Sequence, residues 1–366
     1  MALELVNLTK KFGGGFKLGP LDLKISDNEI LVIVGPTGSG KTTILNLIAG
    51  FVKPDQGSII ADGLDMTNVP VESRRIGYTF QHPSLFPHLT VYDNVVYGLD
   101  KKSKKERKLQ ILKLMDDLSI THLIDRHIQG LSGGEVQKVA LARMLAIRPK
   151  IILMDEPLAQ LDNPSKMRLR LELRKVLKNQ GVLTIYVTHF EDDIYSLADS
   201  VSILQHGNIR YTGKLRSLLT DPTTSSSPFL SNVFTGGNYL EGKVVRSNAG
   251  ITIFKIGSHL LETLGSYSVG IKVGILLRPE DIILSKESVK TSARNIVKVR
   301  IIRILPNQDN PSLVYVNMLL DGFNIVAKIT EESKIELGIK EDDYVFAMFK
   351  ASSPQVVREE YQDSES

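Results

Sequence analysis

A chain of 366 residues is long enough for two or three domains, each with its own hydrophobic core. Its hydrophobic content of 42% and charged content of 23% are ordinary for a soluble globular protein, and a formal net charge of +4 is too small to predict binding to nucleic acid. The sequence has no cysteine, which excludes disulfides and thiolate metal sites and fits a reducing, cytoplasmic setting.

The chain begins MALELVNLTKKF, which lacks the basic-then-apolar order of a signal peptide, and no apolar run approaches the roughly 18–20 residues that span a bilayer. Residues 1–30 alternate apolar and polar side chains, the period of half-exposed antiparallel strands. The apolar run Ile30–Val34 predicts a strand buried on both faces. A glycine-rich loop and a helix over Thr42–Ala49, stopped by Gly50, follow it. Further short strands are predicted at Ser58–Ala61 and Ile76–Phe80.

The middle of the chain, residues 101–146, is mostly helical in pattern, with a break at His127–Ser132. It opens with a basic run, Lys101–Lys108, which we interpret either as a solvated helix start or as a contact for acidic lipid headgroups or a partner. The elements predicted after Pro149 are, in order, strand Ile151–Met154, helix Pro164–Asn179 with Gly181 as its cap, strand Leu183–Val187, and strand Val201–Gln205, which closes the α/β part.

The composition changes around Thr220–Ser231, where Asp221–Pro228 has the Pro/Ser/Thr content of a linker. Short alternating strands separated by turns then occupy residues 239–355, which predicts a small all-β barrel. We therefore expect an α/β domain over 1–220, a linker over 221–238, an all-β domain over 239–356 and a disordered tail over 357–366.

The segment Gly35–Thr42 matches the phosphate-binding pattern G-x-x-x-x-G-K-[ST] between a predicted strand and a predicted helix. Its glycines let backbone N–H groups turn toward phosphate oxygens, and the helix presents the positive end of its dipole to the same charge. We expect Lys41 to reach the β- and γ-phosphates of ATP and Thr42 to bind Mg²⁺.

Two carboxylates follow the buried strand Ile151–Met154. We expect Asp155 to hold the Mg²⁺, directly or through water. The adjacent Glu156 is the better candidate for polarising the attacking water, because phosphoryl transfer depends on positioning more than on covalent help.

With these motifs in order, residues 2–215 resemble the ATP-binding subunit of an ABC transporter. The resemblance implies a P-loop ATPase domain with a RecA-like core, an antiparallel β subdomain and a helical subdomain over about 82–148. Ser132, Gly133 and Gly134 resemble the signature motif, in which Glu135 replaces the commoner glutamine.

Four other positions match motifs of the same family. Gln81 resembles the residue that senses Mg²⁺ and water, and His189 resembles the switch histidine that contacts the γ-phosphate. The D-loop corresponds to Leu158–Asp162, with Gln160 where alanine is usual. Phe12 stands where the family stacks an aromatic ring on adenine, although plain packing is the alternative.

The predicted site therefore has three groups of residues. The catalytic group is Glu156, His189, Gln81 and Lys41. The ATP-binding group is Phe12, Gly35, Pro36, Thr37, Gly38, Ser39, Gly40, Lys41, Thr42, Thr43, Ser132, Gly133, Gly134 and Asp162. The Mg²⁺ group is Thr42, Gln81 and Asp155.

No arginine finger is recognisable, so the resemblance implies a homodimer in which the signature helix of one copy closes the ATP site of the other. Residues Leu85–Val91, with Asn94 and Val95, resemble the importer version of the family. There the segment 82–100 docks two membrane permease subunits at the cytoplasmic face of the membrane, and an external solute-binding protein takes part indirectly. A non-transport ABC ATPase is the rival class.

The β domain indicates which class of solute is transported. Its segments Leu277–Ile282, Thr291–Asn295 and Phe349–Ser353 resemble the OB-like TOBE/Mop domains of molybdate/tungstate importers. A tetrahedral dianion needs hydroxyl, amide and cationic donors, and the candidates are Ser292, Arg294, Asn295, Lys350 and Ser352. A purely structural barrel is the alternative, as is an importer of sugar, sulfate, iron or polyamine.

Overall fold

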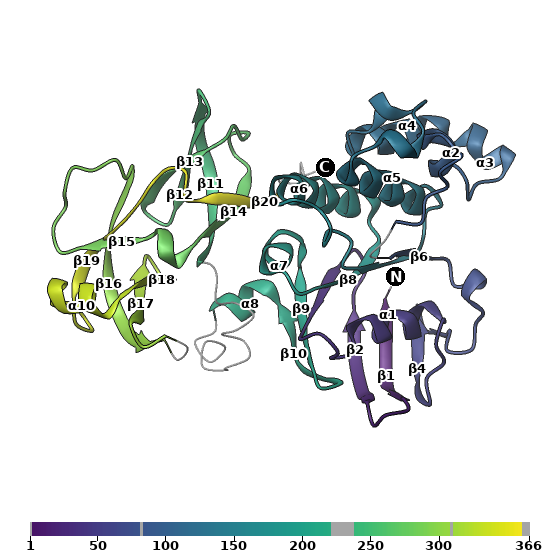
Figure 1. Cartoon of the computed structure of the whole chain (residues 1–366), viewed down its shortest axis with the longest axis horizontal. Coiled ribbons are helices and arrows are strands. Elements are labelled where there is room, and N and C mark those ends of the chain that lie inside the picture. Colours follow the sequence, from purple (N-terminus) through teal and green to yellow (C-terminus); the bar gives the residue numbers. More distant parts are fainter. Residues whose placement is uncertain (1, 81–82, 221–237, 308–309, 361–366) are drawn as a thin grey trace. The chain divides into compact units, whose positions relative to one another are not determined.

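The computed structural model describes residues 2–80, 83–220, 238–307 and 310–360 (Figure 1). It divides the chain into two compact units, residues 1–215 and 216–366. Each unit has a hydrophobic core of its own. The predicted linker lies outside the described residues, apart from Asn238.

The first unit contains an antiparallel sheet with the strand order β2-β1-β4-β5. Its strands are β1 (Leu3–Lys11), β2 (Lys17–Ile25), β4 (Gln56–Ala61) and β5 (Leu64–Asp65). Leu3 pairs with Ile25 and Leu5 with Leu23, and all four side chains are buried. The alternation of apolar and polar residues in this segment thus places one face of the sheet against the core, as predicted.

The second sheet of this unit has the order β10-β9-β3-β8-β7-β6. Its strands are β3 (Ile30–Val34), β6 (Ile76–Thr79), β7 (Ile151–Asp155), β8 (Leu183–Thr188), β9 (Ser200–Gln205) and β10 (Asn208–Lys214). All pairs are parallel except β9 with β10. The strand over 201–205 is therefore not the last one, because a tight turn at His206 and Gly207 adds the half-exposed edge strand β10.

The helices of the first unit surround this parallel sheet. They are α1 (Lys41–Ala49), α2 (Val91–Val95), α3 (Lys101–Glu106), α4 (Lys108–Asp117), α5 (Gly133–Ala146), α6 (Asn163–Gln180) and α7 (Glu191–Leu197), and helix α8 (Leu215–Thr220) begins at the last residue of the unit. Short 3₁₀ turns occur at Val71–Ser73, Thr121–Leu123 and Ile128–Gly130. Helices α2 to α5 gather at one end of the unit in Figure 1, and α1 packs on β7 and β8.

Parallel register brings the carboxyl ends of three strands to one edge of the sheet. Val34 at the end of β3 pairs with Thr188 at the end of β8, and Asp155 at the end of β7 pairs with Val187. In open α/β sheets this edge is the usual place for a ligand. The fold therefore collects the loops after β3, β7 and β8 at one place.

The second unit is built from two antiparallel five-stranded sheets, in the orders β13-β12-β11-β14-β20 and β15-β19-β16-β17-β18. The first sheet contains β11 (Asn238–Asn248), β12 (Ile251–Ile256), β13 (His259–Leu264), β14 (Lys272–Leu277) and β20 (Gln355–Glu360). The second contains β15 (Ile283–Ser285), β16 (Asn295–Pro306), β17 (Leu313–Leu320), β18 (Phe323–Thr330) and β19 (Tyr344–Phe349). A 3₁₀ turn (Pro279–Asp281) and helix α10 (Glu331–Leu337) complete it.

Two features of this unit differ from the prediction. Helix α10 was not expected, although Thr330 caps its first turn and Gly338 ends it. The disordered tail predicted over 357–366 is wrong for residues 357–360, because Gln355–Glu360 forms β20 and pairs with β14. Buried Val356 and Val357 hold this strand against the sheet, whereas residues 361–366 lie outside the described residues.

Candidate nucleotide site

The loop after β3 has the backbone that a phosphate cradle needs. Gly38 and Gly40 have φ of 81° and 105°, a region that side chains disfavour. A Cβ on Gly40 would lie 2.7 Å from Leu18 Cδ1, and one on Gly35 would lie 2.1 Å from the carbonyl oxygen of Leu204. The loop thus packs closely against β2 and β9. Its backbone conformation favours glycine at positions 38 and 40, and the lack of space for a Cβ requires glycine at position 35.

Lys41, the first residue of α1, extends back along this loop. Its Nζ donates to the carbonyl oxygens of Gly35 at 2.8 Å and Pro36 at 3.1 Å. Burial lowers the pKa of Lys41, and the nearby carboxylates of Glu156 and Asp155 oppose that shift. The ammonium group therefore lies where it can meet an anion held by the loop.

Asp155, at the end of β7, is joined to Thr42 by a hydrogen bond between their side chains. Burial raises the pKa of Asp155, the charge of Glu156 raises it further, and Thr42 and Lys41 lower it. The two predicted Mg²⁺ ligands therefore lie side by side. A hydroxyl and a carboxylate oxygen are the hard donors that Mg²⁺ takes beside phosphate oxygens.

Glu156 turns sharply out of β7. Its φ is 44°, and its backbone N–H donates to the carbonyl oxygen of Val187 at 3.0 Å. Its Oε1 lies 2.9 Å from Nδ1 of His189, the residue that follows β8. Two residues 33 positions apart in the chain thus meet over the carboxyl edge of the sheet.

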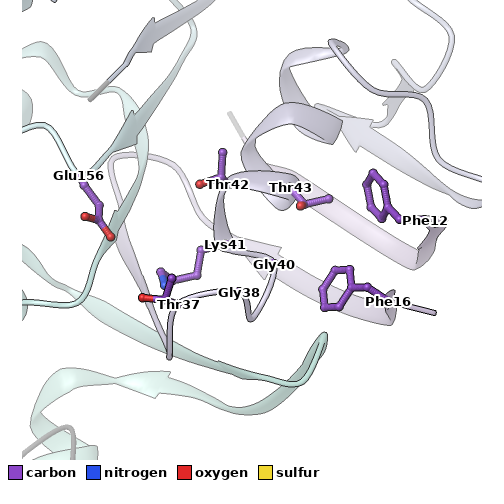
Figure 2. A pocket seen from close by; sticks show the side chains of 9 residues that line it. All are labelled: Phe12, Phe16, Thr37, Gly38, Gly40, Lys41, Thr42, Thr43 and Glu156. Atoms are coloured by element: carbon purple, nitrogen blue, oxygen red, sulfur yellow. The ribbon is translucent and has the colours of Figure 1, made fainter. Parts of the chain in front are cut away.

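Of these groups, Lys41, Thr42 and Glu156 line an open cavity of about 420 Å³. Figure 2 shows Glu156 at one end, Lys41, Thr37 and Thr42 in the middle, and two aromatic rings at the other end. The remaining lining residues are Gly38, Gly40 and Thr43. The length of the cavity therefore runs from an acidic end, past the phosphate loop, to an aromatic end.

The aromatic end consists of Phe12 and Phe16, whose ring centroids are 6.2 Å apart. Phe12 is 39% exposed, and its N–H donates to the carbonyl oxygen of Phe16 at 2.9 Å. Sequence analysis named Phe12 and missed Phe16. The three glycines between them were the available signal, because a turn there brings both rings to the same side.

The signature segment begins helix α5. Ser132 is its N-cap, and Ser132 and Glu135 form a capping box in which the hydroxyl lies 2.7 Å from Glu135 Oε2. The Ser132 N–H donates to the same oxygen at 2.8 Å. These hydrogen bonds lower the pKa of Glu135. The helix N-terminus, with Gly133 and Gly134, lies outside the cavity described above.

The structure describes two of the three other predicted residues, Ser39 and Asp162. Asp162 is the N-cap of α6 and accepts from the N–H of Ser165 at 3.2 Å. Ser39 is buried behind the phosphate loop, where its backbone oxygen accepts from the N–H of Gly207. Gln81 lies outside the described residues.

The family model described as ABC transporter matches residues 18–159, and the one described as TOBE domain matches residues 291–354. A molybdate/tungstate import ATP-binding protein of Pyrococcus horikoshii is 39% identical over 343 residues, which cover 93% of this chain and 96% of that protein. The chain belongs to the ABC transporter ATPases. A spermidine/putrescine import ATP-binding protein of Mesoplasma florum is 35% identical to this ABC ATPase over 289 residues, covering 78% and 81% of the two chains.

Solved structures agree with this assignment. A nucleotide-free ATP-binding cassette of an ABC transporter is 27% identical, with a TM-score of 0.53, and covers 61% of this chain and 97% of its own. A dimeric cassette in a post-hydrolysis state bound to ADP and phosphate is 30% identical, with a TM-score of 0.50, and covers 58% and 99%. The ABC ATPase fold and ATP hydrolysis are therefore established for the first unit, and the second is an all-β TOBE domain.

The predicted oxyanion residues lie where β16 begins and β19 ends. Asn295 pairs with Phe349 across the two strands, so the segments 291–295 and 350–353 are neighbours. Ser292, Arg294, Lys350 and Ser352 are exposed. Asn295 is buried. Its side-chain amide accepts a hydrogen bond from the N–H of Glu262 and donates one to the carbonyl oxygen of the same residue, which favours a structural role for this side chain.

No helix in the described part of the chain combines the length and the apolar character that crossing a membrane requires.

Proposed function

We propose that this ABC ATPase powers an importer of molybdate or tungstate. The observation that carries the proposal is the similarity to the Pyrococcus import protein, which extends through both units rather than through the ATPase unit alone. A second relative named for molybdate/tungstate import, from Pyrococcus abyssi, is 38% identical and also covers 93% of this chain. The spermidine/putrescine relatives cover less of it.

In this proposal the cavity binds MgATP. Adenine stacks at the aromatic end, the loop N–H groups and Lys41 hold the phosphates, and Thr42, Asp155 and Gln81 hold Mg²⁺, which neutralises phosphate charge. Glu156 stands at the phosphate end of the cavity, where a carboxylate orients and polarises the attacking water. His189 fixes the position of Glu156 and approaches the γ-phosphate.

The proposed working form is a homodimer. Ser132, Gly133 and Gly134 lie at the N-terminus of a 14-residue helix, whose dipole and N–H groups favour an anion. They lie outside this chain's own cavity, so they are available to close the cavity of a second copy. ATP would then hold two copies together, and hydrolysis would release them.

The proposed permease contact is the segment 82–100, of which the structure describes residues 83–100. Here the Tyr97 ring is 57% exposed and packs 4.2 Å from the Phe86 ring. Arg143 supports it from α5, with its guanidinium 5.4 Å from the Phe86 ring and a 2.7 Å hydrogen bond to the carbonyl oxygen of Ser84. Tyr97 is thus an exposed aromatic residue on a segment that Arg143 holds in place, which suits the docking of a membrane partner at the cytoplasmic face.

The TOBE domain is proposed to bind the transported oxyanion and to slow the motor. The support is a set of exposed cationic and hydroxyl groups beside the paired strand ends, Ser292 and Arg294 before β16 and Lys350 and Ser352 after β19. Calorimetric titration of the full chain with molybdate, tungstate and sulfate tests it. Heat with molybdate or tungstate that is lost in Lys350→Ala supports binding, and no heat with any of them removes the oxyanion role while leaving the motor intact.

The transport proposal is tested by reconstitution. The chain is purified from membranes with its associated permease, placed in vesicles with the external binding protein, and assayed for ATP-driven uptake of molybdate, tungstate, sulfate and spermidine. Uptake of molybdate or tungstate, lost in Glu156→Gln, is expected. Uptake of spermidine alone would establish the second candidate, a polyamine importer, which the Mesoplasma relative favours.

A further inference from the structure

Helix α6 carries a stripe of polar residues at strict four-residue steps. Asp162 caps the helix, and Lys166, Arg170, Arg174 and Lys178 follow along the same face. The first three of these cations have less than a tenth of their surface exposed. Long cationic side chains are rarely buried in this way unless each has a specific partner.

The partner of Arg170 is Asp193 in α7. Arg170 Nε lies 2.6 Å from Asp193 Oδ1, and both side chains are almost completely buried, at 8% and 2% exposure. A second oxygen acceptor, Asp192 Oδ2, lies 3.3 Å from Arg170 Nη1. A buried ion pair costs desolvation and is weak support for stability, so its geometry is the more informative property.

The other carboxylate oxygen of Asp193 reaches the strand that carries the switch histidine. Oδ2 accepts from the Thr188 hydroxyl at 2.7 Å and from the Tyr186 hydroxyl at 3.2 Å. The Thr188 oxygen in turn accepts from the backbone N–H of Phe190 at 3.0 Å. The residues immediately before and after His189 are therefore both fixed by one buried network.

The same helix reaches Phe190 directly. Lys166 Nζ lies 4.2 Å from the centroid of the Phe190 ring, within the range of a cation–π contact, and the Phe190 and His189 ring centroids are 4.0 Å apart. Lys166 stands one turn after Asp162, the last residue of the D-loop. A continuous chain of contacts thus runs from the D-loop to His189.

We propose that Asp193 and Thr188 are positioning residues for His189, and that Lys166 and Arg170 connect them to the D-loop through α6. The inference rests on the proposed role of His189 at the γ-phosphate. Their contribution is to hold the backbone at 188–190 so that the imidazole stays against Glu156. Misplacing a catalytic group by about 1 Å can cost about 100-fold in rate.

The test uses the full-length chain and a matched control residue that pairs with the same stripe. The variants are Asp193→Asn, which removes the ion pair, and Thr188→Val, which keeps the side-chain shape and removes the hydroxyl bridge to Phe190. The control is Asp199→Asn, since Asp199 forms ion pairs with Arg174 and Lys178 of α6 at 2.8 Å each and accepts a hydrogen bond from the N–H of Ile30 in β3. Thermal unfolding is recorded for all three.

We expect kcat to fall about 10- to 100-fold in Asp193→Asn and Thr188→Val with KM for ATP within about threefold. Asp199→Asn should lower the melting temperature and leave kcat within about twofold. Normal kcat in both test variants, or an equal loss in the control, would overturn the inference.

A double-mutant cycle separates this inference from the proposed function. Once His189→Ala has removed the imidazole, Asp193→Asn should lower kcat no further. An equally large further loss would show that Asp193 acts through something other than His189 and would overturn the positioning role. If His189→Ala alone hydrolyses ATP at the normal rate, it is the proposed role of His189 that fails.

Discussion

His189 and Glu156 share a hydrogen bond, with Nδ1 of the imidazole 2.9 Å from Oε1 of the carboxylate. Each residue directly follows its own strand, β8 and β7, and these two strands are neighbours in the sheet. Glu156 is held in a left-handed backbone conformation, which points its side chain into the cavity beside the phosphate loop. The proposed water-polarising group is thus oriented by strain in its own backbone and by a neighbouring side chain.

Glu156→Gln should nearly abolish ATP hydrolysis and leave ATP binding largely unchanged. The amide keeps the size of the side chain but cannot accept a proton from water, so we expect kcat to fall by about 10²–10⁴. Affinity for ATP, measured with a fluorescent analogue, should change less than threefold because the loop and Lys41 are intact. Glu106→Gln makes the same substitution at an exposed residue of α3 and serves as the control. A variant at position 156 with normal turnover would refute the assignment.

Removing either aromatic ring should weaken nucleotide binding. Stacking on a base contributes about 1–3 kcal/mol, so Phe12→Ala and Phe16→Ala should each raise the Kd for ATP by about 5- to 150-fold. Tyr344→Ala removes an aromatic ring that is more exposed than Phe12 and lies in the second unit, so it should have no effect. If Phe12→Ala changes the Kd and Phe16→Ala does not, Phe16 serves only to pack against Gly40.

The capping box of α5 should show a pH-dependent contribution to stability. Glu135→Ala should cost about 1 kcal/mol at pH 7, in line with the loss of a helix cap. Hydrogen bonds from Ser132 lower the pKa of Glu135 below 4.5, so this stability is present above pH 4.5 and is lost as the pH falls through the folded-state pKa. Urea unfolding at pH 7 and pH 3.5 measures it.

The matched variant is Glu135→Gln. Its amide oxygen can still accept hydrogen bonds from Ser132, so this variant should lose little stability. It also removes a negative charge from the helix end that is proposed to meet the γ-phosphate of a second copy. ATP-dependent dimerisation of Glu135→Gln, followed by light scattering, should then be at least as strong as that of the unmodified chain. Weaker dimerisation would count against the helix end as an anion site.

Asp155→Asn should stabilise the fold and weaken the binding of the Mg²⁺ that ATP hydrolysis requires. Burial raises the pKa of Asp155, so the charged carboxylate disfavours folding at pH 7. That penalty is complete above the raised pKa and vanishes below 3.8, where the group is neutral in both states. We expect the melting temperature at pH 7 to rise by ~2–4 °C, a value discounted for partial exposure.

A comparison with Thr42→Val tests whether Asp155 is a Mg²⁺ ligand. That variant also removes an oxygen proposed to bind Mg²⁺, but it leaves the carboxylate charged and without its hydroxyl partner, so it should not raise the melting temperature. Both variants should require more Mg²⁺ for half-maximal ATPase activity. An Asp155→Asn protein with the normal Mg²⁺ requirement would exclude Asp155 as a ligand.

Much of the fold could be predicted because its signals are local. The buried run Ile30–Val34, the glycine loop and the stop at Gly50 each depend on neighbouring residues, and the ATPase motifs occur at fixed spacings within them. The strand Ile251–Ile256 was predicted to the residue for the same reason, since its β-branched residues lie between two turn glycines, Gly250 and Gly257. Local patterns also identified the change from an α/β to an all-β unit.

Two edge strands were missed because their sequences are largely polar, and only pairing with another strand makes them part of a sheet. Strand β20 reads as a polar tail until it pairs with β14, about 80 residues earlier, and β10 becomes a strand by pairing with β9 across a two-residue turn. The placement of Asn295 is a similar case. Its short polar segment suggests an exposed ligand, yet the fold buries the amide against the backbone of Glu262.

The sequence by itself determined the chemistry of this protein, because the residue types and spacings of a phosphate loop and its acidic strand have few other uses. Only the tertiary structure decided which groups meet. It set Glu156 against His189, placed Phe16 beside Phe12, and joined α6 to the switch through Arg170 and Asp193. The physical reason is that parallel strands align their carboxyl ends whatever their separation along the chain, and no local pattern reports that alignment.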